Sequence, residues 1–485
     1  MPRLVIVMTG LALLVAAAVG VWARGSDPPA GVPVVPTPPG THDLKAFADP
    51  YAWDPRRARE FEQRAAAGNS QVLYMLSPGG VEATAARTAR WRPLVERAAA
   101  TAHVDPDTLE ALVFLESAGR ADARAPGGLD AAAGLTQILA ETANNLLGMH
   151  VDVAASTRIA RRLERAQRRG RGHEVAALRA NRMRVDDRFN PQRALAGTAR
   201  YLQIARARLG REDLAFVSYH MGIGNLETVL RDYGGGRPSY TELYFNSTPT
   251  SHAAAYWRLA GFGDDSSNYL WKLAAAKQIM RLYREDRPEL TRLTALHLAK
   301  ASAEEVLHPA DRTPAFATTA DLKRAWDAHA LVPFPDDERA TGLRRDPRMG
   351  ELAKRLGVPA GMYRGLRPEA LAMALYIGAQ VREISRVSPL TITSTVRDAP
   401  YQALLVRRNG EATRGFSLHT TGWAFDVDRH YQSHRQALAF QFVLDRLRAM
   451  NAIAWVREPD AIHITVSSDA KALLPLLERV KIAAP

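Results

Sequence analysis

Residues 109–138 read LEALVFLESAGRADARAPGGLDAAAGLTQI, and the first part of this stretch has the apolar pattern of a buried helix. Asp105 can cap the helix, Pro106 suits its first turn, and Gly119 marks its end. One carboxylate, Glu116, stands at the C-terminal end among apolar side chains. Burial there would raise its pKa and let it hold a proton near neutral pH. The stretch therefore predicts a general acid, although an isolated glutamate at a helix end is more often a solvated surface residue.

Further segments follow Glu116 in a spaced order. They are Glu116-Ser117, Ala133-Gly134-Leu135-Thr136-Gln137-Ile138, Glu141-Thr142-Ala143, Phe189-Asn190-Pro191, Ala199-Arg200-Tyr201-Leu202 and Ala215-Phe216-Val217-Ser218-Tyr219-His220-Met221-Gly222. This order resembles the soluble lytic transglycosylase family over about residues 90–285. The resemblance implies a mostly α, lysozyme-like domain that cleaves the glycan of peptidoglycan. The chain departs from the family at His220, where Asn is usual, and at Glu141, where Pro is usual, and residues 156–184 look like an insertion.

The resemblance also implies a mechanism that uses one carboxylate and no cofactor. Most glycosidases use two carboxylates, but Glu110 and Glu141 do not stand where the family would place a partner for Glu116. In the family, the acid protonates the glycosidic oxygen, the sugar's N-acetyl group stabilises the cation, and the 6-hydroxyl closes an anhydro ring. The residues expected to orient the sugar or the acid are Ser117, Gln137, Tyr219 and Tyr269. For the two tyrosines, the alternative is an ordinary place in an amphipathic core.

The amino-acid composition limits the kinds of protein and of functional site that are possible. The 485 residues are too many for one core and predict two domains. The absence of cysteine excludes disulfides, thiolate metal sites, cysteine nucleophiles and a lipid-modified N-terminal cysteine. The net charge of +13 indicates a solvated basic surface or attraction to anionic polymers of the cell wall or membrane surface. No stacking motif or recognition helix supports nucleic acid. The densest arginine run, residues 158–171, has helical spacing and is interpreted as the exposed face of an inserted helix.

The ends of the chain suggest export and a modular organisation. Residues 1–23 contain a short basic start and an apolar stretch from Leu4 to Ala23, which reads as a signal peptide or a membrane anchor. We therefore expect an exported protein of the periplasm or cell envelope. The expected map is a linker and N-terminal segment over 24–89, a lytic transglycosylase domain over 90–305, a linker over 306–345 and a second domain over 346–485.

The second domain has a different pattern. A helix is expected from Arg367 to about Ser385, and β-branched runs follow at 390–396, 423–427 and 462–466, with a helix near 435–450 between the last two. These features predict a small α+β domain. Alternation places Asp426 on one strand face, and it places His463 opposite the side chains of Ile462 and Ile464. Two histidines, His419 and His463, together with Asp426, would leave a fourth position open, as catalytic zinc requires. The alternative is a pair of buried, hydrogen-bonded histidines.

The pattern Ser-x-His-x-x-Gly-x-Ala-x-Asp over 417–426, followed by His463, resembles the zinc D-alanyl-D-alanine carboxypeptidase and endopeptidase group over about 365–470. The resemblance implies that Ser417 contacts substrate and that Arg397 holds substrate or the polarised oxygen. The general base stays open between two residues. Asp460 has the usual spacing, three residues before the last histidine, whereas Glu458 has the usual side chain and would need a local two-residue bulge.

Together these patterns predict an exported, bifunctional peptidoglycan-degrading enzyme. One domain would cut the bond between N-acetylmuramic acid and N-acetylglucosamine without water, giving 1,6-anhydro ends, and the other would cut stem peptides with zinc. The alternative is a wall-binding or assembly protein in which one or both centres are inactive. A narrower alternative is a muramidase that uses water, which would need a second carboxylate close to Glu116.

Overall fold

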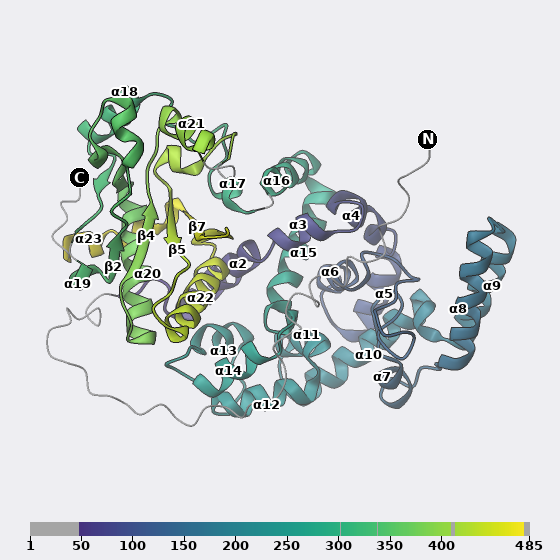
Figure 1. Ribbon diagram of the computed structural model, residues 1–485. Helices are drawn as coiled ribbons and strands as arrows, with labels where there is room; N and C mark the ends of the chain where they lie inside the picture. The colour runs from purple at the N-terminus through teal and green to yellow at the C-terminus, as the bar shows by residue number, and fades with distance from the viewer. Residues whose placement is uncertain (1–47, 301, 337, 409–412, 480–485) are drawn as a thin grey trace. The chain divides into compact units, whose positions relative to one another are not determined.

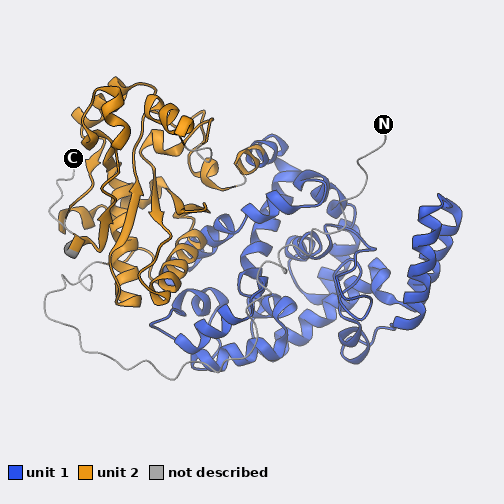
Figure 2. Ribbon diagram, in the orientation of Figure 1, with its two compact units in different colours: residues 1–28, 53–294 blue, residues 29–52, 295–485 orange. Residues whose placement is uncertain are grey.

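The computed structural model describes residues 48–300, 302–336, 338–408 and 413–479, and these residues form two compact units (Figure 2). Unit 1 comprises residues 53–294, and unit 2 comprises residues 48–52 and 295–479. The expected signal peptide or anchor, residues 1–23, lies outside the described residues. Within the described ranges, no helix combines the length and apolar character needed to cross a membrane.

Unit 1 is built from helices and loops. Its elements are η2 (Pro55–Arg57), α2 (Ala58–Gly68), α3 (Gln71–Leu76), α4 (Val81–Ala89), α5 (Arg92–Ala102), α6 (Pro106–Ser117), α7 (Ala140–Asn145), α8 (Val153–Arg168), α9 (Gly172–Val185), η3 (Asp187–Phe189), α10 (Pro191–Leu209), α11 (Glu212–Met221), α12 (Ile223–Tyr233), α13 (Tyr240–Asn246), α14 (Ala253–Gly261), η4 (Asp265–Asn268), α15 (Tyr269–Glu285) and α16 (Arg287–Ala299), which continues into unit 2. Helix α6 packs against α4, α5 and α15 (Figure 1). Its apolar residues are buried, except for the half-buried Leu115.

Helix α6 begins and ends as its sequence predicts. The Asp105 carboxylate accepts the backbone N–H groups of Asp107 and Thr108, and Pro106 occupies the first turn. At the other end, Ala118 and Gly119 both adopt left-handed backbone conformations, with φ of 53° and 72°. A side chain at Gly119 would meet the backbone of Thr88 at 2.6 Å, so glycine is required at this point of contact with α4. Glu116 is therefore held at the end of a rigid, central helix.

Helices α8 and α9 form a hairpin that extends from the rest of unit 1 (Figure 1). Ile159, Leu163 and Ala166 face α9 and form a small core with Leu178. The arginines of the run lie exposed on the opposite face of α8 or just after it; they are Arg158, Arg161, Arg162, Arg165, Arg168, Arg169 and Arg171. The prediction that these arginines form an exposed helix face is confirmed.

Unit 2 is an α+β structure. Its elements are α17 (Glu304–Leu307), α18 (Thr319–Asp327), β1 (Val332–Pro333), α19 (Glu338–Thr341), β2 (Leu343–Arg345), η5 (Glu351–Leu356), η6 (Ala360–Tyr363), β3 (Gly365–Leu366), α20 (Pro368–Ser385), β4 (Leu390–Ser394), α21 (Ala399–Arg408), η7 (Leu418–Thr421), β5 (Ala424–Asp428), α22 (His434–Ala449), β6 (Ile453–Arg457), β7 (Ala461–Val466), η8 (Ser468–Leu473) and α23 (Pro475–Arg479). Five strands form one sheet in the order β2-β4-β5-β7-β6, in which only the β2–β4 pair is parallel, while β1 and β3 form a separate antiparallel pair.

The sheet separates a core from the face that carries the candidate metal ligands. Helices α20 and α22 pack on each other and against β7 and β6, respectively. Phe425, Val427, Ile462 and Ile464 are buried at 1% exposure or less, as the alternating pattern predicts. Asp426 and His463, on the other face, are direct cross-strand partners. At the level of fold class, the described chain is a helical unit followed by an α+β unit, in agreement with the sequence.

The segment expected to be a linker, residues 306–345, is part of the structured unit 2. Strand β2 pairs with β4, and β1 pairs with β3. Phe316, Leu322 and Leu331 belong to a buried cluster with residues of the following segments. The sequence of this segment did not predict β1 and β2, because strands of two or three residues are too short to show a periodic pattern.

Candidate functional site

Glu116 meets a tyrosine from a distant part of unit 1. The Tyr269 hydroxyl, at the start of α15, donates a hydrogen bond of 2.7 Å to Glu116 Oε1. The Tyr269 ring is almost fully buried, and His220 stacks on it with ring centroids 5.2 Å apart. The sequence gives Tyr269 only a weak signal, whereas the packing of α15 on α6 places it directly at the candidate acid.

Opposing effects act on the pKa of Glu116. Burial raises the pKa of Glu116 above its ordinary value, and the charge of His220 and the hydrogen bond from Tyr269 oppose this shift. The side chain keeps partial access to solvent. Among the described residues, no carboxylate contributes to the pKa shift of Glu116. Glu116 is therefore an acid whose protonated form is favoured by burial.

Tyr219 lies near Glu116 and contacts the loop that contains Gln137. The Tyr219 hydroxyl donates to the Thr136 carbonyl at 2.7 Å, which ties α11 to the loop that precedes α7. The proximity of Glu116 contributes to the raised pKa of Tyr219, after burial. Gln137 has a left-handed backbone with φ of 52°, and its side chain donates to the Gly134 carbonyl at 2.8 Å. Both residues are half-buried, so each still presents part of its surface to solvent.

A buried arginine shapes the same loop. Arg188 is fully buried, pairs with Asp186 at 2.9 Å and donates to the carbonyls of Leu129 and Ala131. The Arg188 backbone carbonyl lies so close to Gly134 that a Cβ atom there would approach it to 1.8 Å. Gly134 has a φ of +83° as well, so both sterics and backbone conformation require glycine here. These contacts fix the course of the loop that carries Gln137.

The other carboxylates and Ser117 take structural positions. Glu110 is buried and forms ion pairs with Arg92, at 3.1 Å, and with Arg284. Glu141 is exposed on α7. The Ser117 hydroxyl donates back to the Val113 carbonyl at 3.2 Å, within its own helix. Ser117 is thus adjacent to Glu116 in the chain, but its hydroxyl is turned to the helix backbone.

In unit 2, the three predicted metal ligands converge. Asp426 Oδ1 lies 3.1 Å from His419 Nε2 and 2.9 Å from His463 Nδ1. One ligand atom from each of the three residues lies within 4.8 Å of the others. In a tetrahedral zinc site with bonds of about 2.0–2.2 Å, ligand atoms stand roughly 3.3–3.5 Å apart. Two imidazole nitrogens and one carboxylate oxygen are donors that zinc and other divalent metals accept. This cluster could hold a metal ion.

Contacts behind the cluster orient its members. His419 Nδ1 lies 2.7 Å from the Thr395 carbonyl, so the proton belongs on Nδ1 and Nε2 is directed at Asp426. The second carboxylate oxygen of Asp426 pairs with Arg397 at 3.2 Å. Arg397 also donates to Ser394 at 2.7 Å and to Gln402 at 3.0 Å. The structure thus brings Arg397 to the cluster, where its guanidinium holds Asp426 in place.

The pKa shifts of the cluster follow from its burial and from its paired charges. Burial lowers the pKa of His419 to about 4, with a further contribution from Arg397. Burial alone would raise the pKa of Asp426, but His419 and His463 hold it well below its usual range. Burial lowers the pKa of His463, and the carboxylates of Asp426, Glu304 and Glu458 raise it by more. A deprotonated Asp426 and a neutral His419 are the forms that bind a metal.

The two candidate bases differ in position. The Glu458 N–H donates to the Ala461 carbonyl at 2.9 Å and closes a tight turn between β6 and β7. Asp460 lies exposed at the tip of this turn. Val456 is the cross-strand partner of His463, so Glu458, two residues further along the chain, lies on the same face as His463. Its negative charge contributes to raising the pKa of His463 and opposes the lowering of the pKa of Arg397. A tight hairpin turn, rather than a two-residue bulge, therefore brings Glu458 to the side of the cluster.

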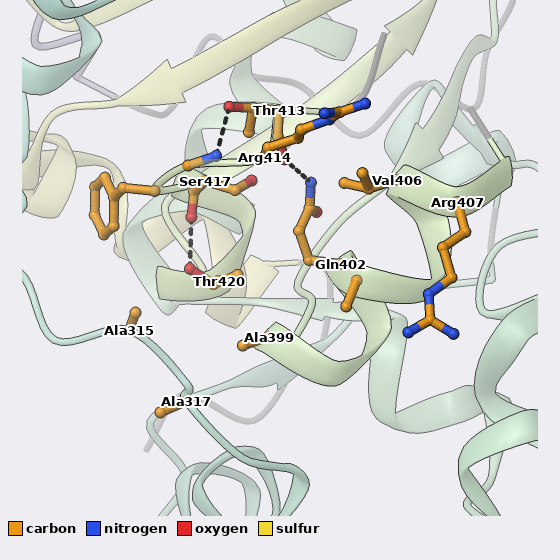
Figure 3. Close-up of a pocket in the computed structure, with 13 residues that line it drawn as sticks. Ala315, Ala317, Ala399, Gln402, Val406, Arg407, Thr413, Arg414, Ser417 and Thr420 are labelled. Carbon is orange, nitrogen blue, oxygen red and sulfur yellow. Dashed lines mark hydrogen bonds between the residues drawn. The ribbon is translucent and has the colours of Figure 1, made fainter. Parts of the chain in front are cut away.

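A pocket of about 490 Å³ adjoins this region (Figure 3). Ser417 and Thr420, which flank the segment of His419, form part of its wall, and Gln402 connects it to Arg397. The remaining lining is largely small or apolar, with Arg407 and Arg414 at its margin. Ser417 is buried, and its carbonyl accepts the Thr420 hydroxyl at 2.6 Å. His419, Asp426 and His463 are not among the residues that line this pocket.

Two residues at these sites escape local sequence reasoning. His220 is adjacent to Tyr219, and its stacking on Tyr269 could not be read from spacing alone. Glu304 lies in the region expected to belong to the first domain, yet it is buried in unit 2 with its Oε2 atom 3.6 Å from His463 Nε2. No motif surrounds Glu304, so only the folded chain reveals this proximity.

Comparisons with known proteins add no family assignment. The chain matches no protein-family model, and none of the curated proteins matches it.

Proposed function

We propose that this protein is an exported, bifunctional peptidoglycan-degrading enzyme. Unit 1 would cleave the bond between N-acetylmuramic acid and N-acetylglucosamine without water, and unit 2 would cleave stem peptides with zinc as its metal. The observation that carries the first activity is the desolvated Glu116, which contacts Tyr269 and has no carboxylate contributing to its pKa shift among the described residues. The convergence of His419, Asp426 and His463 supports the second activity.

In unit 1, a single residue would move both protons. Protonated Glu116 donates its proton to the glycosidic oxygen, and the bond to the anomeric carbon breaks as the sugar's N-acetyl group stabilises the cation. The Glu116 carboxylate, stabilised by the Tyr269 hydroxyl, then accepts the proton of the 6-hydroxyl on the same sugar. The 6-oxygen bonds to the anomeric carbon, which closes the anhydro ring and restores protonated Glu116. No water is consumed, so no second carboxylate is needed.

In unit 2, the side chains would position a peptide and move its protons. Bound zinc would polarise the scissile carbonyl and make a water molecule more acidic. Asp426 is held by Arg397 and His419 by the Thr395 carbonyl, so the ligand set is oriented in advance. Glu458 would accept a proton from water and pass it to the leaving amine. Arg407 and Arg414 at the pocket margin would attract the carboxylates of a stem peptide.

The exposed arginines of α8 are suited to binding an anionic cell-wall polymer. Its side chains are exposed, while the opposite face of the helix is occupied by α9. Arginine binds phosphate and carboxylate groups through paired N–H donors. We therefore expect an anionic cell-wall polymer to bind along the exposed face of α8.

Replacing Tyr269 by phenylalanine is expected to slow glycan cleavage by roughly 10- to 100-fold, because a hydrogen bond to a charged group contributes about 1.5–3 kcal/mol. The hydroxyl stabilises the Glu116 carboxylate, so its loss should also move the alkaline limb of the pH profile upward. Initial rates of anhydro-fragment release measured across pH test both effects. Tyr240→Phe is the matched control, since this buried hydroxyl donates to the Ser267 carbonyl instead. Equal pH profiles for Tyr269→Phe and wild type would contradict the prediction.

Replacing Glu458 by glutamine is expected to reduce peptide cleavage by about 10²- to 10⁴-fold, the range for loss of a general base. Asp460→Asn should leave the rate nearly unchanged, because Asp460 is exposed at the turn tip. Chromatography of stem peptides released from cell-wall material measures both variants, and bound zinc should remain in both. The reverse ranking would assign the base to Asp460.

A further inference from the structure

Helix α17 brings a buried carboxylate to the outer side of the candidate metal cluster. Glu304 Oε2 lies 3.6 Å from His463 Nε2, while the other ring nitrogen, Nδ1, faces Asp426 Oδ1 at 2.9 Å. Both side chains are at most 10% exposed. The His463 ring is therefore placed between two carboxylates, one inside the cluster and one behind it.

Glu304 is itself held in place. Its Oε1 atom accepts Lys300 Nζ at 2.8 Å, and its backbone N–H donates to the Ser302 hydroxyl at 3.3 Å. At the other end of α17, His308 Nε2 lies 2.6 Å from the Val466 carbonyl, and its ring stacks on Trp423 at 4.6 Å. These contacts attach α17 to β7 and to the residue before β5. Lys300 holds one oxygen of Glu304, which directs the other at His463.

The position of Glu304 selects one form of the His463 ring. A neutral imidazole carries its proton on one nitrogen only, and a metal binds the nitrogen without it. At 3.6 Å the contact with Glu304 is an ion-pair distance rather than a hydrogen bond. Without a metal, Nδ1 lies at hydrogen-bond distance from the Asp426 carboxylate and donates its proton there. When a metal occupies the cluster, the negative charge of Glu304 favours a proton on Nε2, which leaves the lone pair of Nδ1 for the metal. The Thr465 hydroxyl, 3.3 Å from Nε2, lies on the same side. His419 has the equivalent support from the Thr395 carbonyl.

We propose that Glu304 is a positioning residue of the metal centre, one that keeps the Nε2 proton of His463 in place and presents Nδ1 to the metal. This proposal rests on the proposed zinc centre of unit 2. It extends the functional site to α17, which lies far before His419 in the chain. Glu304 faces the outer side of the ring, so it would act through His463 and not on the substrate.

The test compares Glu304→Gln with Glu305→Gln in the full-length protein. Glu305 contacts the same Lys300 ammonium, at 3.3 Å, which makes it a matched control. Affinity for Zn²⁺ alone, measured by competition with a chelator, should fall by about 10- to 100-fold in Glu304→Gln, the usual effect of losing an outer partner of a histidine ligand. Glu305→Gln should bind Zn²⁺ as wild type does. Unchanged affinity in Glu304→Gln would overturn the proposal.

A second measurement does not depend on any variant of Glu304. Nitrogen NMR of the histidine-labelled, zinc-loaded wild type reports which ring nitrogen of His463 carries the proton, and His463→Gln identifies the signal. A proton on Nε2 is expected, and a proton on Nδ1 would overturn the proposal even if Glu304→Gln failed to fold. Failure of wild type to bind Zn²⁺ would remove the metal centre, and the role of Glu304 with it. If wild type and Glu304→Gln bound Zn²⁺ equally well, the metal centre would stand and only the proposed role of Glu304 would be rejected.

Discussion

Glu116→Gln is expected to reduce the release of anhydro-ended fragments from intact cell-wall sacculi by about 10²- to 10⁴-fold, the contribution typical of general acid–base catalysis. Glutamine keeps the size of the side chain, and its amide oxygen can still accept the Tyr269 hydroxyl. It cannot donate the proton that breaks the glycosidic bond. Mass spectrometry of the soluble fragments measures the loss, and sedimentation with sacculi should show that the variant still binds.

The matched control for this variant is Glu141→Gln, which removes an exposed carboxylate from α7 in the same unit. Its release rate should equal that of wild type. Equal rates for Glu116→Gln and wild type would reject Glu116 as the acid. Binding without release by the wild type would favour the wall-binding alternative, and reducing ends in place of anhydro ends would favour a water-using muramidase.

The pH dependence of release has a definite sign. Glu116 must be protonated to act, and burial raises its pKa above the ordinary glutamate value. Activity should therefore persist to a higher pH than an exposed glutamate would allow, and it should fall as the pH rises through the raised pKa. A rate that increases over this range would show that the deprotonated carboxylate is the active form.

Local sequence patterns predicted the elements that carry each site. Three features of α6 involve only residues close together in the chain, so local sequence predicts them. They are the cap at Asp105, the apolar face of the helix and the backbone turn after Ser117. The same holds for the alternation on β5 and β7, which places Asp426 and His463 on one face and the apolar residues on the other. Periodicity of this kind follows from backbone geometry and needs no knowledge of the tertiary fold.

Contacts between distant segments could not be predicted in this way. Tyr269 reaches Glu116 because α15 packs on α6, and Glu304 reaches His463 because α17 is attached to β7. Strand β6 was not predicted either. Its five residues follow α22 after a short turn, and their sequence does not stand out as a separate strand. Its pairing with β7 decides the position of Glu458, because the tight turn places Glu458 near the cluster and leaves Asp460 exposed. Spacing favours Asp460 and side-chain type favours Glu458, so the sequence left both open, and only the folded turn shows how differently the two are placed.

His419→Ala is expected to abolish zinc binding and peptide cleavage together. The substitution removes one of three ligands, so the loss of affinity should exceed the roughly 10- to 100-fold that follows from losing an outer partner. The fold should persist because Arg397 still pairs with Asp426. A lost hydrogen bond between buried groups costs about 1–3 kcal/mol, which a unit of this size tolerates when its apolar core is intact. Metal content by atomic emission and chromatography of released stem peptides measure the two effects.

The two activities should respond separately to this change. Glu116 lies in unit 1 and its proposed chemistry needs no metal, so His419→Ala should release anhydro fragments at the wild-type rate. Treating wild type with a chelator should likewise stop peptide cleavage and leave the release of anhydro fragments unchanged. His434→Ala, which removes an exposed histidine at the start of α22, should retain zinc and both activities. If His419→Ala kept its zinc, the cluster of His419, Asp426 and His463 would be a buried hydrogen-bonded group rather than a metal centre. If it lost zinc while peptide cleavage continued, the metal would stabilise unit 2 without taking part in the reaction.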